Sequence, residues 1–286
     1  EERLGHKVVL KEPSNDMAFY GTEGDGADIE VIHSQLPPEH YFNQLPKAMV
    51  QHGEPLSSVA NGVSMKAICD LANRVDFFLC FRREEWPIWS MIKRTYQVPK
   101  GIDLEVYKPL EGITEKLPGE PAILYYENMR GTRNPLYLLV AMQEVFKRFP
   151  KARLYIYNMN DKKMQDTFTT FSRACKLWAC GVVGFEGPVN DVPLLLSRVD
   201  IVVSCLFPLY ARSLESFGAG KPLICPGYNE PNYPFTCTLD PHSFAEAIIN
   251  CWDKYELFDA RAWACEKHDV AETVRQCINI FERYIS

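Results

Sequence analysis

Short apolar runs alternate with longer amphipathic segments along nearly the whole chain. The runs expected to form strands are residues 7–10, 29–33, 47–51, 77–80, 122–126, 153–157, 181–185, 201–204 and 222–225. The segments expected to form helices are residues 65–73, 86–95, 135–149, 163–177, 191–198, 214–218, 243–252 and 271–285. Short apolar strands between helices are typical of parallel sheets with both faces covered. Two such series in tandem predict an α/β fold with two doubly wound domains.

The segment 98–119 is rich in proline, glycine and charged residues, which is typical of a linker. We therefore expect an N-terminal domain over residues 1–100 and a C-terminal domain over residues 101–270, followed by a final helix over residues 271–286. A chain of 286 residues is long enough for two domains of ordinary size.

Charge and cysteine content limit the classes of partner. The net charge of −6 argues against broad electrostatic binding to nucleic acid or anionic lipid, although a local basic patch is compatible with it. The ten cysteines are dispersed without C-x-x-C spacing, so we expect buried reduced thiols and no zinc site. No run approaches the ~18 apolar residues of a membrane span, and no signal peptide is recognisable. We therefore expect a soluble, cytoplasmic protein.

The segment 213–222 (SLESFGAGKP) combines one carboxylate with small residues and a Gly-x-Pro stop. It predicts a short helix that carries Glu215 in its first turns, ends at Gly220 and passes through Pro222 into a strand. A carboxylate in a crevice beside strand ends can accept two hydrogen bonds from a vicinal diol such as a ribose. The alternative is a glutamate favoured by the helix dipole, with small residues for close packing.

This segment resembles the E-A-M-A-x-G-x-P motif of GT-B glycosyltransferases that use nucleotide sugars, specifically the retaining group 1 or family 4-like enzymes. Further segments resemble motifs of the same family in the same order: LGHKVV (4–9), DIEVIH (28–33), MVQHG (49–53), VPKGIDLEVYKP (98–109), VGFEGPV (183–189) and LLSRVDIVVS (195–204). The resemblance covers nearly the whole chain. It implies the GT-B architecture, in which two Rossmann-like parallel-sheet domains face a cleft and the final helix crosses back onto the first domain.

The resemblance also implies where the chain begins within the family's fold. It places Leu4 after the first strand, Gly-rich loop and helix of the relatives. We therefore expect the first domain of this sequence to lack those parts. A trimmed chain is a simpler explanation for this than their true absence from the protein.

The resemblance implies roles for several residues. Glu215 would hold the ribose of the donor. The backbone of Ser213, Leu214 and Gly218 would form a wall of the donor site, close to the donor. The two histidines that follow apolar strands would line the cleft, with His52 near the transferred sugar and His33 on the acceptor side. Each could instead be a loop histidine with a structural hydrogen bond.

Two departures from the family pattern affect the donor site. The position of the family's first glutamate is Phe207 here, and a phenyl ring supplies no carboxylate. In the loop after strand 122–126, Arg133 falls where the family places a phosphate-binding lysine, while the arginine position falls near Glu127 or Asn128. We expect Arg130 to compensate, because a diphosphate needs cationic or N–H donors. The alternative is that both arginines are solvated loop residues.

The implied reaction transfers a glycosyl group from a nucleoside diphosphate sugar to an acceptor hydroxyl, with retention and without a metal or other cofactor. Arg130, Arg133 and His52 would be its catalytic residues. A sugar-nucleotide epimerase of the same fold stays an alternative, as does a catalytically impaired nucleotide-sugar binder, which Phe207 favours. An oxidoreductase that uses a dinucleotide is disfavoured, because no G-x-G-x-x-G follows a strand.

The acceptor, the donor base and the donor sugar stay open. Lipid, polysaccharide, protein, small metabolite and modified nucleic acid are all candidate acceptors. An aromatic and basic cluster of Arg82, Arg83, Trp86 and Trp89 suits peripheral contact with a membrane surface or stacking on a ring. An amphipathic helix packed against the core explains the same cluster equally well.

Overall fold

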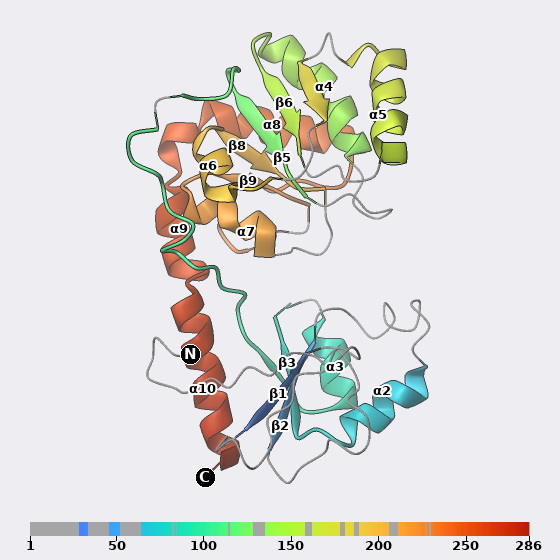
Figure 1. Cartoon of the computed structure of the whole chain (residues 1–286), viewed down its shortest axis with the longest axis vertical. Helices are drawn as coiled ribbons and strands as arrows, with labels where there is room; N and C mark the ends of the chain where they lie inside the picture. The colour runs from blue at the N-terminus through green and yellow to red at the C-terminus, as the bar shows by residue number, and fades with distance from the viewer. Residues whose placement is uncertain are drawn as a thin grey trace. The chain divides into compact units, whose positions relative to one another are not determined.

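The fold is given by a computed structural model of the chain. It divides into two compact units, Glu1–Gly101 with Val270–Ser286, and Ile102–Asp269 (Figure 1). The boundary between the units lies within the proline- and glycine-rich segment 98–119. The structure describes residues 29–33, 46–51, 64–81, 83, 85–113, 115–127, 135–157, 162–177, 181–185, 189–205, 211–226, 228 and 230–285.

The first unit contains a parallel sheet with the strand order β1-β2-β3-β4. Its strands are β1 (Glu30–His33), β2 (Lys47–Gln51), β3 (Phe77–Cys80) and β4 (Thr95–Gln97). The prediction of strands near 29–33, 47–51 and 77–80 is confirmed, and the predicted strand 7–10 lies outside the described residues.

Strand β4 was not predicted, because residues 86–95 were expected to form one helix. Helix α3 (Trp86–Ile92) ends earlier, and the backbone at Lys93 is extended with φ −151° and ψ 157°. The chain then pairs Thr95 and Tyr96 with Phe78 and Leu79 of β3. The β-branched and aromatic side chains of Thr95 and Tyr96 suit a strand, which explains this departure.

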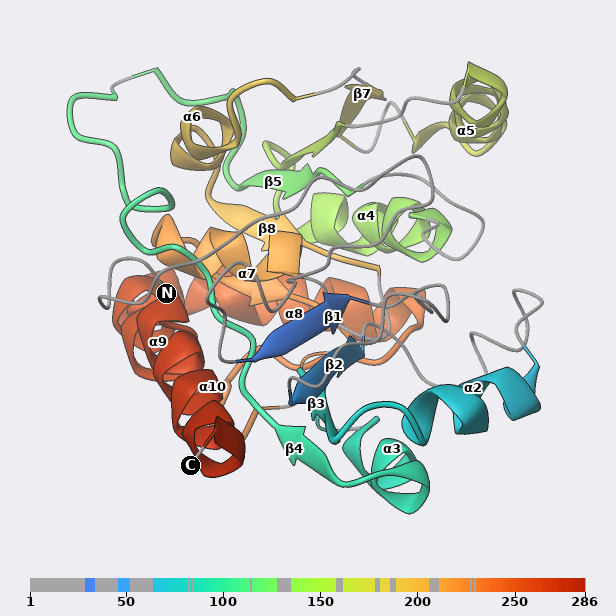
Figure 2. The same cartoon turned by 60° about the horizontal axis from the view of Figure 1, so that its bottom comes forward.

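Helices cover both faces of the first sheet. Successive strand residues point to opposite faces, and Phe77 and Phe78 of β3 belong to different apolar clusters. Phe78 meets α2 (Met65–Ala72) and α3, with its ring edge-on to Trp89 at 5.2 Å between centroids. Phe77 meets α10 (Val270–Ile285) and stacks on Tyr284 at 4.2 Å. Figures 1 and 2 show α2 and α3 on one side of the sheet and α10 on the other.

The second unit contains a five-stranded parallel sheet with the order β7-β6-β5-β8-β9. The strands are β5 (Ala122–Tyr125), β6 (Arg153–Ile156), β7 (Val182–Phe185), β8 (Ile201–Val203) and β9 (Leu223–Ile224). The chain moves outward from β5 through β6 to β7, and then returns to the other side of β5 for β8 and β9. The strand order therefore reverses between β5 and β8. In such sheets the reversal point is where ligands bind, at the carboxyl ends of the strands.

Helices flank the strands of the second unit, and four of the described helices pack in two pairs. They are α4 (Leu136–Arg148), α5 (Lys162–Ala174), α6 (Val192–Ser197), α7 (Ala211–Gly218), α8 (Pro241–Asp253) and α9 (Ala260–Lys267), with a short 3-10 helix at Tyr255–Leu257. α4 lies beside α8, and α7 lies beside α9 (Figures 1 and 2). All were predicted within a few residues except α9 and the 3-10 helix. The prediction of two doubly wound α/β units with parallel sheets is confirmed.

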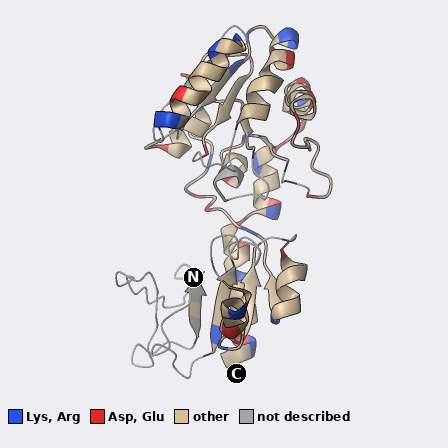
Figure 3. Cartoon of the chain, turned by 90° about the vertical axis from the view of Figure 1, so that its right-hand side faces the viewer, with Lys and Arg blue, Asp and Glu red and all other residues tan. Residues whose placement is uncertain are grey.

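Basic and acidic positions are interspersed over the described helices rather than separated by sign (Figure 3). Six of the nine described cysteines are buried, as expected, whereas Cys69 and Cys265 are exposed. Among the described residues, no helix has both the length and the apolar character needed to cross a membrane.

Candidate functional site at the carboxyl ends of β5 and β8

The reversal point of the second sheet is lined by polar groups that directly follow the two strands. Tyr126 and Glu127 follow β5, while Ser204 and Cys205 follow β8. All four residues are nearly inaccessible, with exposures between 0% and 3%. Buried polar groups at the ligand-binding edge of a parallel sheet make this region the candidate site.

Glu215 reaches this region from helix α7. It is the fifth residue of Ala211–Gly218, so it lies beyond the first turn, and its side chain is half-buried. The Tyr126 hydroxyl donates a hydrogen bond to Oε2 of Glu215 at 3.3 Å. Since the dipole effect decays within the first turn of a helix, a capping role explains Glu215 poorly. The carboxylate is instead held by Tyr126, the first residue after β5.

The end of α7 follows the predicted pattern. Gly220 has a positive φ of +73°, its N–H donates to the Phe217 carbonyl, and the N–H of Lys221 donates to the Ser216 carbonyl. These two bonds form a Schellman motif, in which glycine is favoured because it has no Cβ. The prediction that Gly220 ends the helix and that a strand follows is confirmed.

Packing within the protein accounts for two of the other predicted donor-site residues of α7. Leu214 is fully buried in the core of the second unit. A Cβ at Gly218 would lie 2.5 Å from the Tyr107 carbonyl oxygen, so close packing against Tyr107 already accounts for this glycine. Ser213 lies in α7, with its side chain outside the described set. A donor-site role for these three residues stays a prediction.

Glu127 is a buried carboxylate that sequence reasoning missed. It is 2% exposed, and its Oε1 accepts a 2.7 Å hydrogen bond from the fully buried Ser204 hydroxyl. Burial raises the pKa of the neighbouring Cys205 thiol well above its usual value, and the charge of Glu127 adds to this rise. The sequence signal for Glu127 is an acidic residue directly after an apolar strand. The family resemblance pointed to Glu127 only as a position where an arginine was expected.

Arg130, Arg133, His52 and Phe207 lie outside the described residues. His33 ends β1, but its side chain is not described. Of the predicted site residues, Glu215 is therefore the one whose side-chain contacts at the reversal point are known. The roles of the others stay predictions.

The aromatic and basic cluster of α3 divides between core and surface. Trp89 is 3% exposed and packs on the sheet of the first unit, whereas Trp86 is 42% exposed. The Trp86 indole N–H donates to the Thr95 carbonyl at 3.0 Å. Arg83 is exposed, and Arg82 lies outside the described residues. The core explanation therefore applies to Trp89, and membrane contact through Trp86 stays a prediction.

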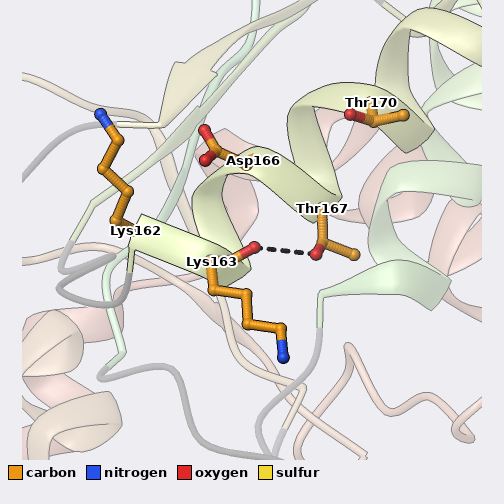
Figure 4. Close-up of a pocket in the computed structure, with 5 residues that line it drawn as sticks. All are labelled: Lys162, Lys163, Asp166, Thr167 and Thr170. Carbon is orange, nitrogen blue, oxygen red and sulfur yellow. Dashed lines mark hydrogen bonds between the residues drawn. The ribbon is translucent and has the colours of Figure 1, made fainter.

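An open hollow of about 540 Å³ lies on helix α5 (Figure 4). It is lined by Lys162, Lys163, Asp166, Thr167 and Thr170. The Thr167 hydroxyl donates to the Lys163 carbonyl of its own helix. A hollow lined by a single helix offers few converging groups for a ligand. Within the described part of the chain, no group of three or more His, Cys, Asp or Glu side chains could hold a metal ion.

Solved structures share the fold of this chain. HepE from Anabaena, in complex with UDP, matches with a TM-score of 0.66 at 16% identity, over 84% of this chain and 73% of HepE. A glycosyltransferase from Rickettsia africae ESF-5 matches with a TM-score of 0.66 at 13% identity, over 90% of this chain and 77% of its own. The chain has the GT-B fold.

A third solved structure is also similar to this chain. Sucrose-phosphate synthase from Thermosynechococcus elongatus matches with a TM-score of 0.63 at 12% identity, over 84% of this chain and 68% of its own. The sequence matches no protein-family model and no curated protein. The resemblance to GT-B glycosyltransferases is thus confirmed at the level of the fold.

Proposed function

We propose that this chain is a glycosyltransferase that moves a sugar from a nucleoside diphosphate sugar to an acceptor hydroxyl. One observation carries the proposal: the Glu215 carboxylate is held by Tyr126 at the point where the strand order of the second sheet reverses. Ligands of doubly wound sheets bind at such points. GT-B neighbours support the class of ligand, since HepE is described in complex with UDP and with UDP-glucose.

In this proposal Glu215 binds the ribose of the donor. An ionised carboxylate has about four lone-pair sites and can accept hydrogen bonds from both hydroxyls of a vicinal diol. The diphosphate is bound by Arg130 and Arg133, because its charges need cationic partners. The backbone of Ser213, Leu214 and Gly218 forms the wall beside the donor.

The chemistry follows from the donor. The bond between the anomeric carbon and the diphosphate oxygen breaks, and the acceptor oxygen forms the new bond on the same face of the sugar. The acceptor proton passes to the departing diphosphate, whose growing charge Arg130 and Arg133 stabilise. His52 binds a hydroxyl of the sugar, and His33 shapes the acceptor side. In this scheme the enzyme needs no metal ion or other cofactor and acts in the cytoplasm.

A panel of nucleotide sugars tests the proposal. The purified chain is mixed with UDP-, GDP-, ADP- and TDP-sugars, and the melting temperature is measured. A bound donor raises the melting temperature by mass action, so we expect at least one sugar nucleotide to do so, and Glu215→Ala to abolish most of the rise. Glu246→Ala, which removes an exposed glutamate of helix α8, is the matched control and should retain it.

Product analysis then separates transfer from the alternatives. With the donor that binds, mass spectrometry should detect the nucleoside diphosphate and a sugar transferred to water or to an added acceptor. Recovery of an epimerised sugar would identify an epimerase, and binding without turnover would identify an impaired binder. If no nucleotide sugar raises the melting temperature, the proposed function is wrong.

A further inference from the structure

Tyr126 contacts the proposed ribose-binding residue without itself being accessible. Its ring is 1% exposed and belongs to the core of the second unit. It is the first residue after β5, so its backbone is fixed by the strand that forms the centre of the sheet. The hydroxyl nevertheless reaches Oε2 of Glu215 at 3.3 Å. A buried residue of this kind can orient a side chain that binds a ligand, but it cannot bind the ligand in place of that side chain.

The hydrogen bond has a direct consequence for Glu215. A glutamate side chain that is only half-buried has several rotamers available, and binding a ligand in one of them costs conformational entropy. The Tyr126 hydroxyl selects the rotamer in which Oε2 points toward the end of β5. It occupies one lone-pair site of that oxygen, and an ionised carboxylate has about four such sites in all.

The surroundings of Tyr126 hold this donor in place. The next residue, Glu127, is bonded to Ser204 at the end of β8 at 2.7 Å. β5 and β8 are themselves paired through Ile123 and Leu124. Tyr126 therefore lies between a paired strand and a residue whose side chain is bonded to the segment after β8, as a precise binding geometry requires.

We propose that Tyr126 is a positioning residue that fixes Glu215 for a ribose diol and thereby makes the site select ribonucleotides over 2′-deoxyribonucleotides. The inference rests on the proposed function of Glu215. A carboxylate fixed in one rotamer can bind both hydroxyls at once, whereas a mobile carboxylate gains less affinity from the second hydroxyl. Selectivity for the 2′-hydroxyl, rather than affinity alone, is therefore the property that depends on Tyr126.

The test compares ribose and 2′-deoxyribose forms of one ligand. UDP, GDP and ADP are titrated calorimetrically, and the one that binds best is compared with its 2′-deoxy form. In the unmodified chain we expect the ribose form to bind about tenfold more tightly, as for one hydrogen bond to a charged group. In Tyr126→Phe we expect this ratio to fall at least about threefold, mainly through weaker binding of the ribose form.

Matched variants separate positioning from a loss of stability. Tyr126→Phe removes one oxygen and keeps the buried ring, and urea unfolding checks that the fold is retained. Tyr155→Phe is the control: it removes another largely buried tyrosine hydroxyl of the same unit, which donates to the Pro118 carbonyl at 2.6 Å, and the ratio should not change. Replacing Tyr126 by 4-aminophenylalanine restores an N–H donor and should restore the ratio.

The outcomes distinguish this inference from the proposed function. If the ribose form is preferred and Tyr126→Phe keeps the full ratio, or if Tyr155→Phe lowers it equally, the positioning role is wrong while the proposed function stands. The ratio of the affinities for the ribose and 2′-deoxyribose forms is also measured in Glu215→Gln and in the double variant that carries both Glu215→Gln and Tyr126→Phe. If these two variants have the same low ratio, the two residues act as one unit, as proposed. If none of UDP, GDP and ADP binds the unmodified chain although a nucleotide sugar raises its melting temperature, the inference is wrong while the proposed function stands. If no nucleotide sugar raises the melting temperature, both are wrong.

Discussion

The hydroxyl of Ser204 lies 2.7 Å from Oε1 of Glu127, and this buried pair joins the end of β8 to the end of β5. The two residues are 77 positions apart in the sequence. The bond closes the strand pair at which the order of the sheet reverses, next to Tyr126 and its contact with Glu215. The pair therefore supports the backbone on which the proposed donor site is built.

Removal of the Ser204 hydroxyl should destabilise the protein. In Ser204→Ala the buried Glu127 carboxylate loses this hydrogen bond, so we expect a loss of about 1–3 kcal/mol in the free energy of unfolding. Urea denaturation measures it. Ser90→Ala, which removes an exposed helical serine hydroxyl bonded to its own helix, should change stability by less than about 0.5 kcal/mol. Equal effects of the two substitutions would contradict the structural role of the Ser204 bond.

Gly218→Ala distinguishes packing from donor binding. A Cβ would lie 2.5 Å from the Tyr107 carbonyl oxygen, so we expect overpacking to cost about 1–3 kcal/mol in stability. If Gly218 also forms the wall of the donor site, the folded variant should bind the nucleotide sugar less tightly than the unmodified chain does. Calorimetry on the folded variant decides between the two. Undiminished stability would show that the backbone near Tyr107 yields easily.

The contact between α4 and α8 should depend on pH. A hydrogen bond from the His242 imidazole to the Glu144 carboxylate and the charge of Glu246 raise the pKa of His242 above its usual 6.5. Because the folded-state pKa is higher than the unfolded one, this stabilisation is fully present below pH 6.5 and is lost as the pH rises through the folded-state pKa. The melting temperatures of the unmodified chain and His242→Gln should therefore differ more at pH 6 than at pH 9. A difference that is constant with pH would contradict this interpretation.

The loop arginines should affect turnover more than binding. The charge on the departing diphosphate grows in the transition state, so Arg133→Ala and Arg130→Ala should lower kcat by a larger factor than they weaken donor affinity. Steady-state rates and calorimetric affinities measure the two effects. Arg148→Ala, at an exposed arginine of α4 paired with Asp253, is the control. Turnover at the unmodified level in both loop variants would mean that other groups hold the diphosphate.

Local sequence signals predicted most of the fold. The runs at 47–51 and 77–80 become β2 and β3 with the same bounds, because apolar strands are recognisable from consecutive residues. Gly220 ends α7 because its positive φ is a local requirement. Helix α9 was missed, although Asp259 caps it by accepting a hydrogen bond from the Ala262 N–H, a signal that a short helix with weak apolar periodicity makes easy to overlook.

The candidate site was less predictable, because it depends on contacts between distant segments. Glu215 was recognised from its motif, but its contact with Tyr126 joins residues 89 positions apart. Burial of an acidic residue such as Glu127 contradicts the usual preference of that residue type, and it becomes understandable only when Ser204 is beside it. Sequence patterns identify single groups, whereas the partners that fix them follow from the topology of the sheet.

Calorimetric binding of the donor to the unmodified chain and to Glu215→Ala tests the central claim most directly. The nucleotide sugar that raises the melting temperature most is titrated into both proteins, and circular dichroism confirms that both are folded. We predict that Glu215→Ala weakens binding by about 1–3 kcal/mol, the range for loss of a charged hydrogen-bond partner. Equal affinity of the two folded proteins would contradict the account, and Glu215 would then be a structural residue of helix α7.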